Sequence, residues 1–110
     1  MELENLEHYD YLPSKDGSVT IKESKIHGLG IFATRKITKG NTIGVSHVSI
    51  GCHCYRVNFG GYINHSDEPN SEIVKAGILE YTTKAILDIE KGQEITVDYR
   101  KSICGCKPNV

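Results

Sequence analysis

The chain has 110 residues and a formal net charge of −1, with 13 Lys and Arg residues against 14 Asp and Glu residues. This length fits one domain with a modest core, because so short a chain buries only about 60–70% of its unfolded surface. The balanced charge provides no basic patch, so we expect no nucleic-acid partner. The apolar runs are too short to span a membrane.

The N-terminal stretch MELENLEHYDYLPSKDG is acidic and has no apolar block of the kind found in signal peptides. We therefore expect a polar leader over residues 1–18 and an intracellular protein, located in the cytoplasm or in a host cell.

Short strand-like segments follow the leader. Their alternating or β-branched pattern, together with glycine-containing turns between them, predicts a mainly β domain. No window of the sequence favours a long amphipathic helix. The segments are 19–21, 26–32 (a glycine-rich turn that leads into a strand), 42–45, 78–83 and 95–99.

The sequence also contains a weak internal repeat. Residues 33–43 (ATRKITKGNTI) and 85–95 (AILDIEKGQEI) share Ala, Ile, Lys-Gly and a final Ile at matching places. This pattern predicts two similar units in which glycine provides a positive φ before the next strand. Lys-Gly turns before β-branched strands are also common without any repeat.

The four cysteines form two Cys-x-Cys pairs, Cys52 with Cys54 and Cys104 with Cys106. Without an export signal, we expect unpaired thiols or a metal site in preference to disulfides.

Three further motifs occur in order along the chain. They are HGLGIFA from His27, GYINHS from Gly61 with Pro69-Asn70 after it, and GQEITVDY ending at Tyr99. Together they resemble the SET domain, the catalytic fold of protein-lysine methyltransferases, over about residues 19–99. The Asn-His-Ser-x-x-Pro-Asn motif paired with a downstream Glu-Ile-Thr-x-Asp-Tyr carries most of this resemblance.

The resemblance implies a β-clip fold of small curled sheets, with a knot-like crossing where the C-terminal part passes beneath the Asn-His-Ser segment. It places the SET domain at residues 19–100 and a cysteine-containing tail, similar to a truncated post-SET segment, at 101–110. It also implies S-adenosylmethionine as the methyl donor and a protein or peptide lysine as the acceptor. The compact chain suggests a viral or bacterial enzyme, with a histone or another protein as substrate.

The resemblance also assigns site residues. Gly28 and Gly30 would let the backbone approach the donor, and Leu29 would contact it through the main chain. The resemblance implies that Asn64 binds the donor ammonium through its side-chain carbonyl, and that His65 holds the adenine through backbone groups with its ring packed inward. It also implies that Tyr99 points its hydroxyl at the reacting centre and that Tyr62 lines the donor or lysine pocket.

This chemistry suits the residue types. Methyl transfer to an amine is a direct displacement, so it depends mainly on proximity and orientation. The lysine must be neutral although its pKa in water is about 10.4. A dry aromatic channel disfavours the ammonium form. Val97 and Ile73 occupy plausible channel-shaping places.

Two features depart from the family pattern. Many members carry an arginine shortly before the Asn-His pair, where this chain has Gly60-Gly61. The insert over residues 45–59 is also short, so a second subunit in a homodimer would complete the peptide groove, or substrate binding is weak.

The cysteine tail resembles the start of a zinc-binding extension, but Asp67 stands where that pattern has a cysteine. Cys52 and Cys54 would supply the missing pair, so that four thiolates with Cys104 and Cys106 hold a structural zinc ion.

Two other functions fit parts of the sequence. One is a weakly active or inactive SET-fold module that binds the donor or a peptide. The other is a structural or carbohydrate-related β-clip domain, which leaves Asn64, His65 and Tyr99 without a role.

Overall fold

The computed structural model describes residues 16–51 and 53–101. These residues form eight strands and two short 3-10 helices and contain no α-helix, which confirms the prediction of a mainly β domain. The elements are β1 (Val19–Glu23), β2 (Leu29–Ala33), β3 (Thr42–Ile50), β4 (His53–Arg56), η1 (Asn58–Tyr62), β5 (Asn64–His65), β6 (Ser71–Lys75), β7 (Glu80–Ala85), β8 (Thr96–Val97) and η2 (Tyr99–Lys101).

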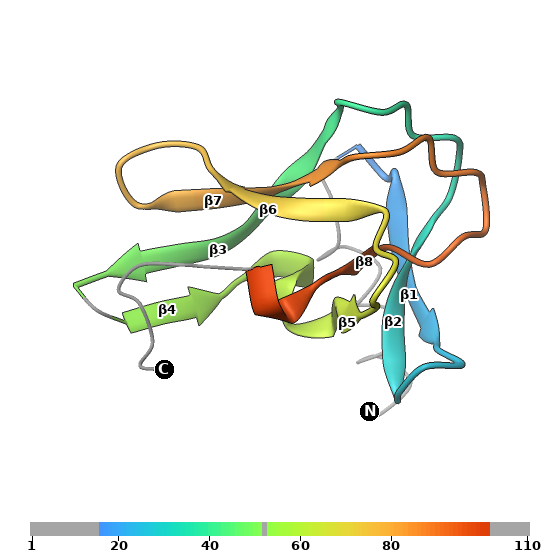
Figure 1. The fold of residues 1–110 in the computed structure, drawn as a ribbon, viewed down its shortest axis with the longest axis horizontal. Helices are drawn as coiled ribbons and strands as arrows, with labels where there is room; N and C mark the ends of the chain where they lie inside the picture. Colours follow the sequence, from blue (N-terminus) through green and yellow to red (C-terminus); the bar gives the residue numbers. More distant parts are fainter. Residues whose placement is uncertain (1–15, 52, 102–110) are drawn as a thin grey trace.

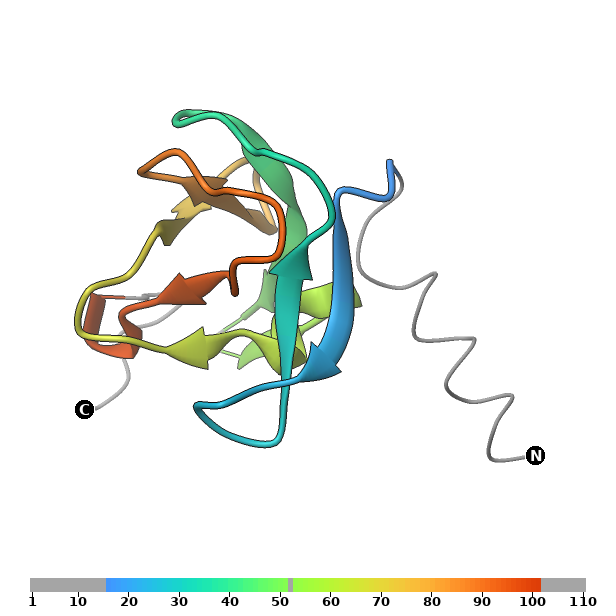
Figure 2. The same cartoon turned by 90° about the vertical axis from the view of Figure 1, so that its right-hand side faces the viewer.

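The strands form three small sheets. β1 and β2 make an antiparallel hairpin, and a four-stranded antiparallel sheet has the order β4-β3-β7-β6. β5 and β8 pair in parallel although about thirty residues separate them in the chain. In Figure 1 this short pair lies between the four-stranded sheet and the β1–β2 hairpin, and Figure 2 shows the curled arrangement from the side. The parallel pair is where the predicted C-terminal crossing meets the Asn-His-Ser segment.

The two repeat units pair with each other. Ile37 and Ile89 exchange both backbone hydrogen bonds, each at 2.8 Å, while Ala33 bonds the turn at Gly92 and Ala85 bonds the turn at Gly40. Both glycines have a positive φ, 93° at Gly40 and 89° at Gly92, as predicted. The repeat is therefore a structural one, in which two similar turns face each other in antiparallel orientation.

The same repeat builds much of the core. Its matching alanines and isoleucines are all buried, and they form one cluster with residues of β1, β2, η1 and β8. The cluster consists of Val19, Ile31, Ala33, Ile37, Ile43, Phe59, Ile63, Ala85, Ile89, Ile95 and Val97.

Some strand boundaries differ from the sequence prediction. The segment predicted at 78–83 begins as a strand only at Glu80. Ala76 donates its backbone N–H to Glu80 O, so the residues between Ala76 and Glu80 form a turn. The segment predicted at 95–99 is a strand only at Thr96 and Val97, and η2 starts at Tyr99. None of the helices in the described parts of the chain has the length and apolar character of a membrane span.

Candidate donor and lysine site

The β5–β8 pair brings two of the three sequence motifs together. Asn64 lies opposite Thr96 and His65 opposite Val97 in the register of these strands. Asn70 adds a second connection, since its side chain donates to Glu94 O at 2.8 Å and accepts from Thr96 N at 3.0 Å. The Asn-His-Ser-x-x-Pro-Asn segment and the segment ending at Tyr99 are thus held as one unit.

Asn64 connects this unit to the third motif. Its Nδ2 lies 3.1 Å from His27 O, 3.2 Å from Leu29 O and 2.8 Å from a Glu94 carboxylate oxygen. The side-chain nitrogen therefore points into the glycine loop. No described residue donates a hydrogen bond to Asn64 Oδ1. Among the described residues every fully buried side-chain polar atom has a partner, so Oδ1 must be open to solvent.

Glu94 holds the same loop from the other side. Its carboxylate accepts bonds from Ser24 Oγ at 2.8 and 2.9 Å, and Ser24 Oγ in turn accepts from Ile26 N at 2.9 Å. A Cβ at Gly30 would lie 2.2 Å from Glu94 Oε2. Glycine at this position is therefore required for the close approach of the carboxylate.

The glycine loop itself is a tight turn. Gly28 has a φ of 46°, and Ser24 donates its backbone N–H to Gly28 O at 2.7 Å. Leu29 is 37% exposed, and its carbonyl accepts from Asn64. The structure thus brings Gly28, Leu29 and Gly30 beside Asn64, and their roles toward a donor stay predictions.

Tyr99 makes two contacts to the Asn-His segment. Its hydroxyl donates to Ile63 O at 2.6 Å, and its backbone N–H donates to His65 Nδ1 at 3.0 Å. Because Nδ1 accepts, the proton of a neutral His65 ring lies on Nε2, which is 3.0 Å from Asp67 Oδ1. The sequence placed this ring inward, but its side chain is 34% exposed and bonds to Asp67 and Tyr99.

A charged cluster follows Tyr99. Arg100 bonds both oxygens of Asp98 at 2.9 Å and Asp67 Oδ1 at 3.2 Å. The hydrogen bond from the Arg100 side chain is the main reason that the pKa of Asp98 falls from 3.8 to about 2. Asp67, which stands at the place of a zinc-binding cysteine in the family pattern, bonds Arg100 and His65 here.

A pocket of about 260 Å³ lies beside Tyr99. It contains Val97 and Ile73, the two predicted channel-shaping residues, and its other lining residues are His47, Arg56, Gly60, Ile63 and Tyr99. Burial of the ring, followed by the positive charge of Arg56, lowers the pKa of His47 below its usual 6.5. Three apolar side chains beside a tyrosine hydroxyl and a neutral histidine suit an amine that must lose its proton.

Tyr62 does not line this pocket. It is half-buried in η1 and packs against the core cluster. The structure therefore shows Tyr62 in contact with the core, and its role at a pocket wall stays a prediction.

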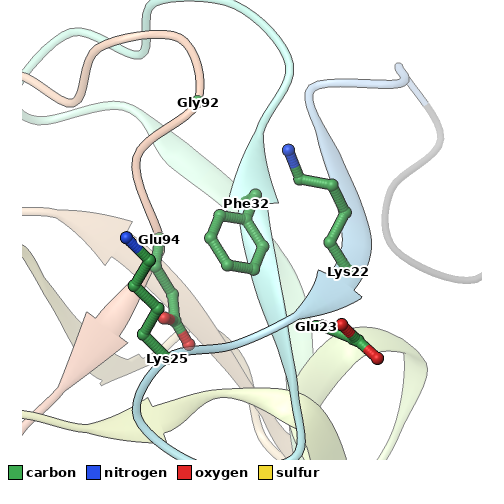
Figure 3. A pocket seen from close by; sticks show the side chains of 6 residues that line it. All are labelled: Lys22, Glu23, Lys25, Phe32, Gly92 and Glu94. Atoms are coloured by element: carbon green, nitrogen blue, oxygen red, sulfur yellow. The ribbon is translucent and has the colours of Figure 1, made fainter.

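A second, more open pocket of about 710 Å³ shares no lining residue with the first. In Figure 3 the side chains of Lys22 and Lys25 lie on either side of Phe32, with Glu94 on the side of Lys25. The Lys22 ammonium is 5.0 Å from the centre of the Phe32 ring. Glu94 thus stands between this pocket and Asn64.

The two glycines that stand where many family members have an arginine differ in the space around them: a Cβ at Gly61 would meet nothing within 4 Å, whereas Gly60 is closely packed. A Cβ at Gly60 would lie 2.0 Å from Ser46 O, a backbone atom of β3 that cannot swing away as a side chain can. Any larger residue at this position, arginine included, would push η1 off the sheet.

At least one cysteine does not follow the expectation that unpaired thiols or a metal site would be favoured over a disulfide. The structure records Cys54 as disulfide-bonded, whereas the sequence ranked disulfides last. A sulfur in a disulfide is not a thiolate ligand, so Cys54 cannot bind zinc in this form. Cys52, Cys104 and Cys106 lie outside the described residues. Within the described parts of the chain no group of three metal-binding side chains occurs.

Four residues of the site were missed from sequence alone: Ser24, His47, Arg56 and Glu94. Only Glu94 carried a signal, because it belongs to the third motif. The positions of the others depend on how β1, β3 and β4 pair.

Comparisons with known proteins agree with this geometry. A family model of the SET domain matches residues 46–100, half of the chain. A Plasmodium falciparum crystal structure, of a protein proposed to be a histone methyltransferase, has a similar fold with a TM-score of 0.68 at 23% identity. The similarity covers 74% of this chain and 92% of that chain. No curated protein matches the sequence. The chain belongs to the SET domain family, whose members are in general protein-lysine methyltransferases.

Proposed function

We propose that the chain transfers a methyl group from S-adenosylmethionine to the side-chain amine of a protein lysine. The carrying observation is the side chain of Asn64, which ties the glycine loop, Glu94 and the Tyr99 segment into one site. Three motifs that lie far apart in the sequence meet at this residue.

The residues present fit the donor. Its amino-acid part carries an ammonium group, and the accessible Asn64 Oδ1 is an acceptor that no described residue uses. The turn at Gly28 exposes backbone, so Gly28, Leu29 and Gly30 would hold the donor together with Asn64, His65 and Tyr99. When bound, the donor would supply an electrophilic methyl group.

The pocket beside Tyr99 would receive the lysine. Ile63, Ile73 and Val97 provide an apolar wall that disfavours the ammonium form and assists its loss of a proton. The Tyr99 hydroxyl donates to Ile63 O, which fixes its direction and leaves its oxygen able to accept a hydrogen bond from the amine. This bond supports the proposal that Tyr99 is the catalytic hydroxyl.

Two measurements test this proposal. The first is calorimetric titration of S-adenosylmethionine and S-adenosylhomocysteine into the wild-type protein. The second is transfer of a labelled methyl group to a panel of proteins that includes histones, a class suggested by the similarity to the Plasmodium protein. Absence of donor binding together with absence of labelling on every substrate would reject the proposal.

One observation favours the alternative of a donor-binding or peptide-binding module without turnover. Tyr99 is 56% exposed, so the described residues alone do not close a channel around it. Clear donor affinity without methyl transfer to any substrate would support this module instead.

The predicted homodimer and structural zinc remain proposals. Sedimentation at several concentrations would reveal a dimer. Metal analysis of the reduced protein, purified without chelator and compared with the oxidised protein, would reveal zinc bound through thiolates.

A further inference from the structure

A row of four side chains crosses the four-stranded sheet beside the Tyr99 pocket. The strand registers pair Arg56 with His47, His47 with Tyr81, and Tyr81 with Lys75. Directly opposite residues share one face of a sheet, so all four lie on the face that carries the pocket residues His47 and Arg56. We call these four residues the cross-sheet row.

The two ends of the row are cations and its middle is buried. Arg56 and Lys75 are exposed, whereas His47 and Tyr81 are 8% and 9% exposed. Two contacts fix the position of the Lys75 side chain: its ammonium lies 5.3 Å from the Tyr81 ring centre and donates a hydrogen bond to Ile78 O. No described residue forms an ion pair or a side-chain hydrogen bond with Arg56.

Within residues 16–51 and 53–101, no carboxylate pairs with Arg56 or Lys75. None lines the pocket, and Glu72 and Glu80 lie on the opposite face because side chains alternate along β6 and β7. Asp98, which precedes Tyr99 in the chain, and Asp67 both bond Arg100. The positive charge of Arg56 reaches the pocket itself, since it contributes to the lowered pKa of His47.

We propose, resting on the function proposed above, that the target lysine lies in an acidic stretch of its protein, with carboxylates on both sides that contact Arg56 and Lys75. Neighbouring strands are about 4.8 Å apart, so the three steps of the row span about 14 Å, the length of about four extended residues. Acidic residues about two positions before and after the lysine would therefore reach the two cations. A basic segment around the lysine would instead be repelled at both ends.

The test uses three peptides with one central lysine, flanked two positions away on each side by glutamate, glutamine or lysine. Binding is measured by fluorescence anisotropy with S-adenosylhomocysteine present, and methyl transfer is measured in parallel. At low salt we expect the glutamate peptide to bind about three- to tenfold more tightly than the glutamine peptide, because each exposed charge pair contributes little alone. The difference should shrink at high salt, where screening shortens the range of charge interactions to about 3 Å.

Arg56→Glu should reverse the order of the glutamate and lysine peptides, and Arg56→Gln should fall between it and the wild type. Lys91→Glu is the matched control, since Lys91 is exposed in the loop before β8 and belongs to neither the pocket nor the row. Thermal unfolding checks that each variant is folded.

The outcomes separate the two proposals. Equal binding of the three peptides, a wild-type preference for the lysine peptide, or no effect of Arg56→Glu would overturn the acidic-substrate inference even if methyl transfer occurs. The expected order of binding without any methyl transfer would support the inference while counting against the enzyme.

Discussion

The contact between Gly30 and Glu94 allows a sharp test of how the glycine loop is held. In Gly30→Ala the new Cβ would lie 2.2 Å from Glu94 Oε2 and 2.9 Å from its Cδ. The carboxylate must swing away, which breaks the 2.8 Å bond to Asn64 and disturbs the pair of bonds from Ser24. Hydrogen bonds to charged groups contribute about 1.5–3 kcal/mol each, and Glu94 is partly open to water, so we expect a loss of about 2 kcal/mol in unfolding free energy.

This cost in stability should depend on the carboxylate of Glu94. Glu94→Ala alone should cost about as much, since it removes the same bonds. With the carboxylate absent, adding Gly30→Ala should be close to neutral, because the nearest remaining atom is Ser24 Cβ at 3.0 Å and alanine restricts the unfolded chain. The coupling free energy between the two substitutions should thus be about 2 kcal/mol.

The assay is urea unfolding followed by far-ultraviolet circular dichroism, since the chain has no tryptophan. Gly61→Ala is the control, because a Cβ there meets nothing within 4 Å, and it should change stability by less than about 0.5 kcal/mol. Additive costs for Gly30→Ala and Glu94→Ala would refute the idea that the carboxylate is what excludes a side chain at Gly30.

Three other predictions concern the site. Tyr99→Phe should reduce methyl transfer by about a hundredfold or more, the range typical of losing one positioned hydrogen-bonding group. Donor affinity should stay nearly unchanged. Activity within a few-fold of wild type would show that the Tyr99 hydroxyl is not needed for the reaction. Asn64→Ala should weaken donor binding in calorimetry, and unchanged affinity would count against its contact with the ammonium. The pKa of His47 in the folded state lies below 6.5, so just below pH 6.5 the unfolded chain binds more protons than the folded one. The contribution of His47 to stability should therefore be complete above pH 6.5 and decline as the pH falls. In urea unfolding at stepped pH, His47→Gln should flatten this decline, and an equal slope in both proteins would contradict the prediction.

The sequence was most informative where local patterns and glycine chemistry coincide. The repeat of Ala, Ile and Lys-Gly correctly predicted two similar turns, because each glycine needs a positive φ and each isoleucine needs a core position. The three motifs likewise led to the correct fold. The orientation of the units, with Ile37 bonded to Ile89, depends on long-range pairing and was not readable from the sequence.

Side chains whose place depends on sheet pairing were predicted least well. Arg56 and His47 are neighbours only through the β3–β4 register, so no spacing in the sequence marks them as lining one pocket. Tyr62 packs from the short helix η1 against the core cluster, and its role at a pocket wall stays a prediction. The disulfide at Cys54 was ranked last because compartment arguments say nothing about which sulfurs meet in space.

We propose that this chain moves a methyl group from S-adenosylmethionine to a lysine held beside Tyr99. The most direct measurement is mass spectrometry of the glutamate-flanked lysine peptide after incubation with the donor and either wild-type protein or Tyr99→Phe. We expect methylation of the central lysine by the wild type, with almost none by the variant. Methylation that is equal in both proteins, or absent from this peptide and from every protein of the panel despite donor binding, would contradict it.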